Sequence, residues 1–324
     1  MKKILILRFS SIGDVVLTTP VIRCIKQQLP GVEVSFVTKE SFRTVVASNP
    51  YIDKLYTFKK EVSELFDVLA SEKYDCLIDL HKNLRSLRLK RHLKTKNYSF
   101  DKINFQKFLA VNFKALNSLP KKHIVQRYLE TVAPLGVKDD GKGLDYFIES
   151  SEEINASLDY FKTNQPVKFL ALVLGGSYVT KKIPLSKLKE ICYQSSLPII
   201  LLGGKEDKVI ADELQKEFPS LYNTCGSLSI NQSASLVKQC EWIITSDTGM
   251  MHIASAFQKK IISVWGNTIP EFGMSPYLPL LENKILELKD LKCRPCSKLG
   301  FSNCPAGHFN CMQKIDFSFV SELQ

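Results

Sequence analysis

The chain has 324 residues, a length that suits two domains of about 150 residues each better than one. Hydrophobic residues make up 44% of the chain and charged residues 24%, which is typical of a folded protein with a substantial core and excludes a disordered or collagen-like chain. The formal net charge of +11 suggests a nucleic acid, a membrane surface or an anionic small molecule as a partner.

Short apolar runs alternate with segments of helical periodicity along the chain. The predicted strands are Lys3–Leu7, Val32–Val37, Lys54–Phe58, Asp75–Asp79, Phe169–Leu174, Pro198–Leu202, Trp242–Thr245 and Ile261–Val264. The predicted helices include Asp14–Leu29, Val62–Glu72, Leu185–Ser195 and Asp207–Phe218. Strands and helices that alternate with short polar links predict parallel sheets covered by helices, so we expect an α/β protein.

A long basic region of helical character, from Asn83 to about Leu135, separates two such series of strands and helices. We expect an N-terminal Rossmann-like domain over residues 1–150 and a C-terminal one over residues 151–324, with a last helix that can pack back on the N-terminal domain. Two such domains are expected to face each other across a cleft. Ligands of open parallel sheets bind beyond the carboxyl ends of the strands, so functional residues are expected in the loops that follow the strands.

The loop after the first strand reads Ser-Ser-Ile-Gly-Asp, residues 10–14. Gly13 permits a tight turn, and the amides that follow it can hold an anion. At the mouth of the cleft, the Asp14 carboxylate can take a proton from a substrate hydroxyl. Aspartate is also a favoured helix N-cap, and the local sequence leaves both roles open.

Two glycine-rich loops follow strands of the second series. In the first, Gly176, Ser177 and Lys181 offer an amide, a hydroxyl and an ammonium to a phosphate, although a flexible surface loop is an equal alternative. In the second, Glu206 can accept hydrogen bonds from ribose hydroxyls or simply complement a helix dipole. Neither G-x-x-x-x-G-K-[ST] nor G-x-G-x-x-G occurs, which argues against a P-loop and against a nicotinamide or flavin enzyme.

A third loop follows the strand Trp242–Thr245 and reads Asp247-Thr248-Gly249 before a helix of small residues. Asp247 can cap this helix while the amides of Thr248 and Gly249 point outward, which makes a site for a diphosphate. His252 lies one turn into the same helix. A lone helical histidine is more often a packing residue than a ligand, and the sequence does not choose between the two.

Four segments carry a resemblance to a known family: Ile-Leu-Ile-Leu-Arg-Phe-Ser-Ser-Ile-Gly-Asp-Val-Val-Leu-Thr-Thr-Pro (Ile4–Pro20), Lys181 before Pro184, Ser-Asp-Thr-Gly-Met-Met-His-Ile-Ala (Ser246–Ala254), and the closing Cys-Pro-Ala-Gly-His…Cys-Met (Cys304–Met312). They resemble the heptosyltransferases of lipopolysaccharide synthesis, glycosyltransferase family 9, which have the two-Rossmann GT-B fold. The likeness covers nearly the whole chain.

The resemblance implies an inverting, metal-independent glycosyltransferase that moves heptose from ADP-heptose to the lipopolysaccharide inner core, with no cofactor. Asp14 would be the catalytic base on the acceptor hydroxyl. The residues that would bind the donor are Gly176, Ser177, Lys181, Glu206, Asp247, Thr248, Gly249 and His252. Direct displacement needs such a base together with a positive environment for the leaving diphosphate.

Three departures from the family's pattern lie near the expected donor. Ile183 stands where the family usually has tryptophan, Gly175-Gly176 replaces polar residues, and Met250-Met251 is bulkier than usual. They leave open a related GT-B glycosyltransferase that uses another nucleotide-sugar.

Four cysteines near the end of the chain have ligand types suited to structural zinc: Cys293, Cys296, Cys304 and Cys311. The pair Cys293-x2-Cys296 is a good half-site, but the spacing of the second half is irregular. Reduced cysteines that pack a loop are therefore the expected arrangement, and no metal is expected.

The positive charge is concentrated between residues 81 and 127, where thirteen Lys and Arg face the single acid Asp101, a local net charge of 13 − 1 = +12. Its first part interleaves leucines with cations, and Lys82, Arg85 and Arg88 are expected on an acceptor-side surface that suits anionic lipid headgroups. A solvated face is the alternative. Phe105, Phe108 and Phe113 follow at helical spacing and are expected in the core.

The same basic segment motivates a competing class, a nucleic-acid-binding protein. No helix-turn-helix, zinc-finger or aromatic RNA-binding signature supports it, so no nucleic acid is expected as a partner. The apolar run at the N-terminus ends at Arg8 without a cleavage site, and no uncharged stretch reaches the roughly 18 residues of a membrane span. We expect a cytoplasmic protein in peripheral contact with the cytoplasmic face of the inner membrane.

Overall fold

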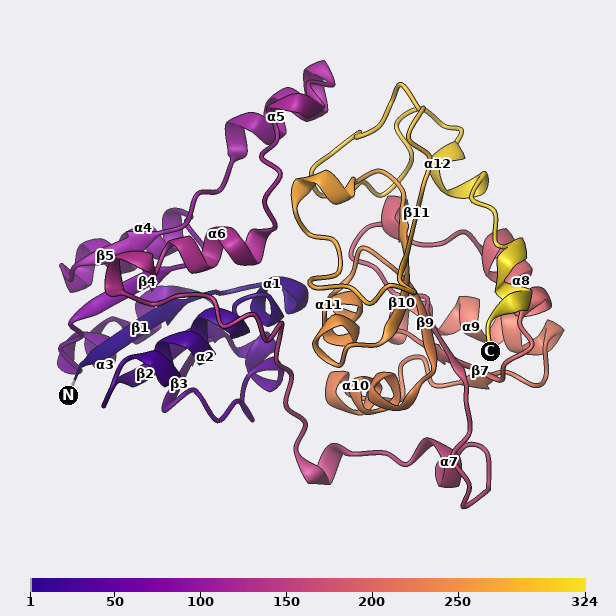
Figure 1. Cartoon of the computed structure of the whole chain (residues 1–324), viewed down its shortest axis with the longest axis horizontal. Coiled ribbons are helices and arrows are strands. Elements are labelled where there is room, and N and C mark those ends of the chain that lie inside the picture. Colours follow the sequence, from indigo (N-terminus) through magenta and orange to yellow (C-terminus); the bar gives the residue numbers. More distant parts are fainter. Residues whose placement is uncertain (1) are drawn as a thin grey trace. The chain divides into compact units, whose positions relative to one another are not determined.

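The computed structural model describes residues 2–324, which form two compact units (Figure 1). The first unit contains the residues up to Lys102 and Lys122–Phe147, and the second contains Ile103–Lys121 and Ile148–Gln324. Each unit is built on its own parallel sheet, which confirms the expected α/β class with two parallel sheets.

The sheet of the first unit has the strand order β3-β2-β1-β4-β5. Its strands are β1 (Lys3–Leu7), β2 (Glu33–Lys39), β3 (Lys54–Phe58), β4 (Cys76–Asp79) and β5 (Asn97–Ser99). The central strand β1 pairs in parallel with β2 and β4, so that Leu5 lies beside Ser35 and Leu77. The central strands are buried along most of their length because helices cover the sheet.

The first unit contains five α-helices in its described residues: α1 (Ile12–Val16), α2 (Thr19–Gln28), α3 (Phe66–Ser71), α4 (Leu84–Leu93) and α6 (Ile124–Glu130). Short 3-10 helices join them, among them η2 (Val62–Leu65). The single helix predicted over Asp14–Leu29 is therefore two helices. The break precedes Pro20, which lies in the first turn of α2, where a residue without an N–H costs no hydrogen bond.

The sheet of the second unit has the strand order β11-β10-β9-β6-β7-β8. Its strands are β6 (Leu170–Val173), β7 (Ile199–Leu202), β8 (Tyr222–Asn223), β9 (Trp242–Ser246), β10 (Lys260–Trp265) and β11 (Lys284–Glu287). Its α-helices are α5 (Asn104–Phe113), α7 (Ala156–Asp159), α8 (Leu185–Gln194), α9 (Lys208–Glu217), α10 (Ile230–Gln239), α11 (Gly249–Ala256) and α12 (Asn310–Gln313). Because the strands are parallel, this order places the carboxyl ends of β10, β9, β6 and β7 side by side, where the loops that follow them can form a site.

The segment Ile103–Lys121 belongs to the second unit, although a single boundary near residue 150 would place it in the N-terminal domain. Its apolar residues Ile103, Ala110 and Leu119 form a buried cluster with Ile269 and Phe272, which explains why this segment packs there. The remainder of α5 is not core. Three phenylalanines expected to be buried are exposed, which corrects that expectation (Phe105 by 69%, Phe108 by 54%, Phe113 by 69%).

The last helical segment, the 3-10 helix η9 (Ser318–Glu322), packs within the second unit. Phe317, Val320 and Leu323 are buried in the core that contains residues of α8, and the Phe317 N–H donates to Glu190 Oε1 at 3.1 Å. The spacing of these three apolar residues puts them on one face of the segment. This segment therefore contributes to the core of the second unit. No helix within residues 2–324 combines the length and the apolarity needed to cross a bilayer.

Candidate functional sites

The loop after β1 carries Asp14 on the first turn of α1. Ser11 is the N-cap, and Asp14 lies at the third helical position, so the capping role considered for Asp14 falls to Ser11. Asp14 Oδ2 accepts hydrogen bonds from the Ser11 N–H at 3.2 Å and from Ser11 Oγ at 2.9 Å. Asp14 Oδ1 lies 2.7 Å from Arg8 Nη2. The carboxylate is thus held in a fixed orientation, with 20% of the side chain exposed.

Arg8 is the buried partner that orients Asp14, and the sequence analysis did not single it out. Its Nε donates to Ser10 O at 2.8 Å, and its Nη1 donates to Leu80 O at 2.6 Å and to Tyr128 Oη at 2.8 Å. Burial disfavours the charged guanidinium, but the Asp14 carboxylate raises the pKa of Arg8 above its ordinary value. Arg8 therefore stays protonated and supplies fixed positive charge beside Asp14.

His81 follows β4 at the same edge of the first sheet and was also not predicted. Its ring centroid lies 4.7 Å from that of Phe9. Burial and the nearby Arg8 guanidinium lower the pKa of His81 to about 4, so the imidazole is neutral at neutral pH. The buried Asp79 fixes the turn, because its Oδ1 accepts the N–H groups of His81 at 3.0 Å and Lys82 at 2.6 Å.

The predicted acceptor-side cations lie on and just before α4. Lys82 is exposed, and the side chains of Arg85 and Arg88 are 37% and 68% exposed. Each of the two guanidinium groups lies 3.9 Å from a carboxylate oxygen of Glu61. A pocket of about 270 Å³ opens here, lined by Glu61, Val62, Ser63, Phe66, Arg88 and Arg91. An anionic group could bind the arginines here in competition with Glu61.

Lys181 and Asp247 meet at the carboxyl edge of the second sheet. Lys181 Nζ, at the end of the 3-10 helix η6 (Val179–Lys181), lies 2.5 Å from Asp247 Oδ2 and 3.4 Å from Asp247 O. Thr268 Oγ1 donates to the same Oδ2 at 3.1 Å. The loops after β6, β9 and β10 are therefore joined through one carboxylate, and Thr268 was missed because a lone threonine carries no motif.

The N-terminus of α11 follows Asp247 directly. Thr248, and not Asp247 as expected, is the N-cap, and no side chain caps the helix. Thr248 Oγ1 instead pairs with Thr245 Oγ1 at 2.9 Å. The first amides of α11, from Gly249 onward, are left without a side-chain acceptor, which suits an anion. His252 is 1% exposed within α11, so it packs inside the unit rather than at its surface.

A buried aspartate connects the two glycine-rich loops. Asp207 is buried between them, with Oδ1 2.6 Å from Lys182 Nζ and Oδ2 accepting the Gly204 N–H at 2.9 Å. A Cβ on Gly203 would lie 2.9 Å from Asp207 Cβ and equally close to Cys225 Sγ, so this glycine is required by packing. The predicted donor residues Gly176, Ser177 and Glu206 lie in these two loops, and the side chains of Ser177 and Glu206 are exposed.

Asn267, two residues after β10, was not predicted. It is 2% exposed, and neither its Nδ2 nor its Oδ1 has a hydrogen-bond partner in the described part of the chain. The backbone around it is fixed, because the buried Arg294 donates to Gly266 O at 2.5 Å and to Thr268 O at 2.8 Å. A buried amide without partners is costly, so a ligand that satisfies it would bind favourably.

The C-terminal cysteines pack and hydrogen-bond a loop. Cys296 Sγ donates to Cys293 O at 3.0 Å, and Cys293 Sγ lies 3.9 Å from His308 Nε2. Burial raises the pKa of Cys296 to about 12 and that of Cys311 to about 11, so both are thiols at neutral pH.

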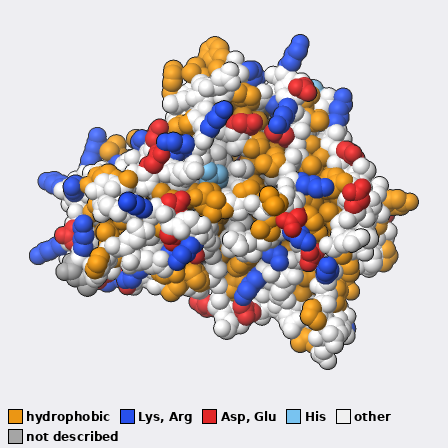
Figure 2. Space-filling model, viewed as in Figure 1, with side chains coloured by type: hydrophobic (Ala, Val, Ile, Leu, Met, Phe, Trp, Pro, Cys, Tyr) orange, Lys and Arg blue, Asp and Glu red, His pale blue; other side chains and the backbone are white. Residues whose placement is uncertain are grey.

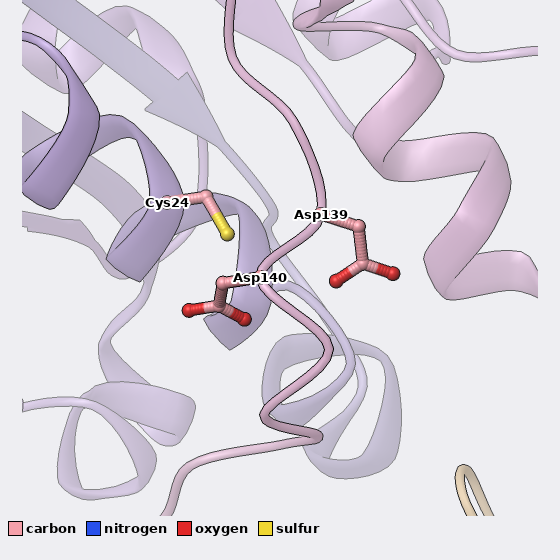
Figure 3. Close-up of side chains that lie close together, drawn as sticks. All are labelled: Cys24, Asp139 and Asp140. Atoms are coloured by element: carbon pink, nitrogen blue, oxygen red, sulfur yellow. The ribbon is translucent and has the colours of Figure 1, made fainter.

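Residues 2–324 contain one group of three potential metal ligands whose ligand atoms lie within 4.8 Å of one another: Cys24, Asp139 and Asp140 (Figure 3). Asp140 already forms a two-point ion pair with Arg23, whose Nε and Nη2 each lie 2.8 Å from a carboxylate oxygen. Burial raises the pKa of the Cys24 thiol to about 11. The group is therefore explained by an ion pair beside a neutral thiol.

The family model and the curated relatives indicate the same family. The model of the family described as glycosyltransferase family 9 (heptosyltransferase) matches residues 62–304. Lipopolysaccharide heptosyltransferase 1 of Campylobacter coli is 26% identical over 293 residues, 82% of this chain and 84% of its own. Lipooligosaccharide heptosyltransferase 2 of Campylobacter jejuni is 25% identical over 330 residues, 94% and 91% of the two chains.

Among solved structures, the E. coli heptosyltransferase WaaC with ADP matches with a TM-score of 0.65 and 19% identity, over 87% of this chain and 92% of that one. The shared fold includes both parallel sheets. The family match contains Lys181, Asp247 and Asn267, whereas Asp14 precedes the matched residues.

Proposed function

Because this chain belongs to glycosyltransferase family 9, the heptosyltransferases, we propose that it transfers heptose from ADP-heptose to the inner core of lipopolysaccharide, with inversion at the anomeric carbon and without a metal ion. The protein is an α/β glycosyltransferase whose fold matches the GT-B heptosyltransferases. The donor, the acceptor and the roles of individual residues are the proposed part.

The observation that carries the proposal is the pairing of Lys181 with the loop that opens α11. The Lys181 ammonium and the uncapped first amides of α11 belong to the same edge of the second sheet. A diphosphate has the charge and the oxygen atoms to bind both. Lys181 pairs with Asp247 in the structure described here, so a bound diphosphate would share or replace that ion pair.

Asp14 is proposed as the base that accepts the proton of the acceptor hydroxyl. A base must present an oriented lone pair, and the contacts with Ser11 and Arg8 fix the orientation of this carboxylate. His81 is neutral at neutral pH, so it adds no second positive charge to that of Arg8. The acceptor oxygen becomes a stronger nucleophile as its proton passes to Asp14.

The chemical step is a single displacement. The acceptor oxygen forms a bond to the anomeric carbon while the bond from that carbon to the diphosphate oxygen breaks, which inverts the configuration. The electron pair leaves with ADP, and Lys181 and the amides of α11 stabilise the charge that develops on the leaving group. These groups perform the task that a metal ion performs in other phosphate-releasing enzymes.

The donor is proposed to be ADP-heptose because the family's name specifies heptose and the WaaC structure contains ADP. One departure from the family pattern no longer argues for a different donor. Ile183 is 4% exposed and packs in the core of the second unit, so it is not a donor contact. The two relatives are named heptosyltransferase 1 and heptosyltransferase 2, and their nearly equal identities of 26% and 25% assign neither number to this chain.

The acceptor is proposed to be carried on a phosphorylated lipid. Arg85 and Arg88 lie on the basic helix α4 and Lys82 lies just before it, in the unit that also carries Asp14. Guanidinium and ammonium groups suit phosphates and acidic sugars of such an acceptor. Transfer to a lipid-borne acceptor would take place at the cytoplasmic surface of the inner membrane.

Asp14→Asn tests the proposal. The variant should lose transfer from ADP-heptose to core-truncated lipopolysaccharide by a factor of at least about 10², the usual contribution of a general base, while ADP still binds. Asp140→Asn is a matched control, because it also breaks an arginine–aspartate pair of the first unit, and it should retain transfer. Substantial turnover by Asp14→Asn would remove Asp14 as the base.

A second arm tests the donor. Wild-type protein is offered ADP-heptose and a panel of other nucleotide-sugars, and the release of free nucleotide is measured with and without acceptor. Preferential turnover of a donor other than ADP-heptose would refute the donor assignment and leave the family membership intact.

A further inference from the structure

The helix α5 is apolar around most of its circumference, yet it is covered on one side only. Ile103 before the helix and Ala110 within it are buried against the second unit. The opposite side carries Phe105, Phe108 and Phe113, with more than half of each side chain exposed. An exposed apolar side of a helix is normally covered by protein or by lipid.

The exposed residues form one continuous surface. At 100° per residue, Phe105, Phe108 and Phe113 lie on the same half of the helix, and the rings of Phe108 and Phe113 are in edge contact at 6.1 Å between centroids. Leu116, in the following turn, is 39% exposed. Figure 2 shows the corresponding hydrophobic patch at the top of the view, over α5. We call these four residues the α5 patch.

The chain around the α5 patch is positively charged. Between Asp101 and Glu130 the sequence contains no acidic residue. Lys107 and Lys114 lie on the packed side of α5, where Lys107 Nζ is 5.6 Å from the Phe272 ring centroid and Lys114 Nζ donates to Pro295 O at 2.8 Å. Lys121 is exposed shortly after the patch. Exposed aromatic rings flanked by cations only are complementary to an anionic lipid surface.

We propose that the α5 patch inserts into the headgroup and upper acyl region of a bilayer that contains anionic phospholipids, and that the exposed Lys121, shortly after the patch, pairs with the lipid phosphates. This proposal deepens the proposed function, because it names the surface through which the enzyme reaches a lipid-borne acceptor. It rests on the proposed function for the purpose of membrane binding, but the binding itself can be measured independently. At 10 residues α5 is too short to span a bilayer and has the length of an interfacial anchor.

Several features favour a membrane over a protein partner. The patch is formed by side chains of one helix and of the turn after it. Phenylalanine provides large apolar area without a hydrogen-bonding group that needs a specific partner. The segment between Asp101 and Glu130 contributes no carboxylate of its own that would repel an anionic headgroup.

Vesicle sedimentation tests the proposal. Full-length protein is mixed with vesicles of phosphatidylethanolamine and phosphatidylglycerol, or of phosphatidylcholine alone, and the bound fraction is measured. We expect binding to the anionic vesicles that weakens with salt. The triple variant Phe105→Ser, Phe108→Ser, Phe113→Ser should bind them at least about tenfold more weakly, because each ring contributes apolar area to insertion.

The matched control replaces two exposed apolar residues elsewhere in the second unit. Tyr193 on α8 is 82% exposed and Val209 on α9 is 77% exposed. The double variant Tyr193→Ser, Val209→Ser should bind vesicles like the wild type. Equal loss of binding in this control and in the triple variant would show nonspecific adsorption and overturn the proposal.

Tryptophan fluorescence gives a readout that does not depend on removing the patch. The native Trp242 and Trp265 are buried, at 7% and 1% exposure, so they provide a constant background. Phe108→Trp should shift its emission to shorter wavelength when anionic vesicles are added, and Tyr193→Trp should not. An unchanged spectrum of Phe108→Trp on saturating vesicles would overturn insertion.

The size of the protein in solution tests the other possible occupant of the patch. If the patch joins two copies of the chain, the wild type will be dimeric and the triple variant monomeric, and that result would overturn the membrane assignment. Failure of the proposed function is recognised separately. A wild type that binds anionic vesicles but transfers no heptose to a delipidated, soluble acceptor refutes the proposed transfer and leaves membrane binding intact.

Discussion

Replacing Asn267 with leucine tests whether the buried amide after β10 is reserved for the donor. Both polar atoms of this 2% exposed side chain lack a partner among the described residues. An unsatisfied buried polar group costs about 1–3 kcal/mol, and an isosteric apolar residue removes that cost. Asn267→Leu should therefore stabilise the free protein by about 1–3 kcal/mol. At about 2–4 °C per kcal/mol for a unit of this size, Tm should rise by several degrees.

The effect on donor binding should have the opposite sign. If the amide donates to and accepts from the bound nucleotide, leucine removes those hydrogen bonds and weakens ADP binding by about 1–3 kcal/mol, roughly 5–150-fold in Kd. Thermal denaturation without ligand measures the first effect, and isothermal titration with ADP measures the second. A residue that lowers stability but contributes to binding is expected to give a higher Tm and a weaker ADP affinity when it is replaced.

Asn223 is the matched control for this prediction. It lies at the end of β8 in the same sheet, but its Nδ2 donates to Asp212 Oδ1 at 2.7 Å and its Oδ1 accepts the Cys225 N–H at 3.0 Å. Asn223→Leu should lower Tm and leave ADP affinity unchanged. The reasoning about Asn267 is refuted if Asn267→Leu also lowers Tm, or if it raises Tm with no loss of ADP affinity.

Three further predictions concern single residues of the two units. The pKa of His81 is about 4 in the folded protein against about 6.5 unfolded, so stability should fall by up to about 3 kcal/mol as pH drops from 6.5 to 4, and urea titrations of His81→Phe should lack this loss. Lys181→Met should weaken ADP binding roughly tenfold or more by calorimetry, whereas Lys187→Met, which removes a partly buried ion pair with Glu190, should not. Gly203→Ala should destabilise the second unit by about 1–3 kcal/mol in denaturant titrations, because its Cβ would lie 2.9 Å from Asp207 Cβ; unchanged stability would contradict the packing role of this glycine.

The central strands and the edge strand β3 could be predicted from the sequence, and the other edge strands could not. β1 and β3 have the predicted bounds, because each is a short run of residues with high strand propensity between polar links. The short strands β5, β8 and β11 lie at sheet edges and are half-exposed, so they lack the apolar runs that reveal a buried strand. Their pairing is decided by tertiary contacts.

The candidate donor site was predictable where a motif marks it. Asp247 and Lys181 were found because each belongs to a pattern that follows a strand, and the structure brings their side chains to 2.5 Å. Thr268 and Asn267 were not found, because a threonine or asparagine after a strand is ordinary in sequence. What distinguishes Asn267 is the lack of any partner for a buried amide, and this property exists only once the surrounding chain is folded.

The concentration of charge between residues 81 and 127 suggested one continuous basic surface, and the fold divides it. The sequence count treats every cation as free, whereas Lys90 lies 2.9 Å from the buried Asp79 and Arg127 is 3% exposed. Lys122 pairs with Glu130 at 2.6 Å, and Lys114 donates to backbone carbonyls. Because part of the charge is used inside the two units, net charge alone overstates what the surface offers to an anion. The exposed phenylalanines of α5, which a charge count ignores, therefore become the sharper indication of where a lipid surface would bind.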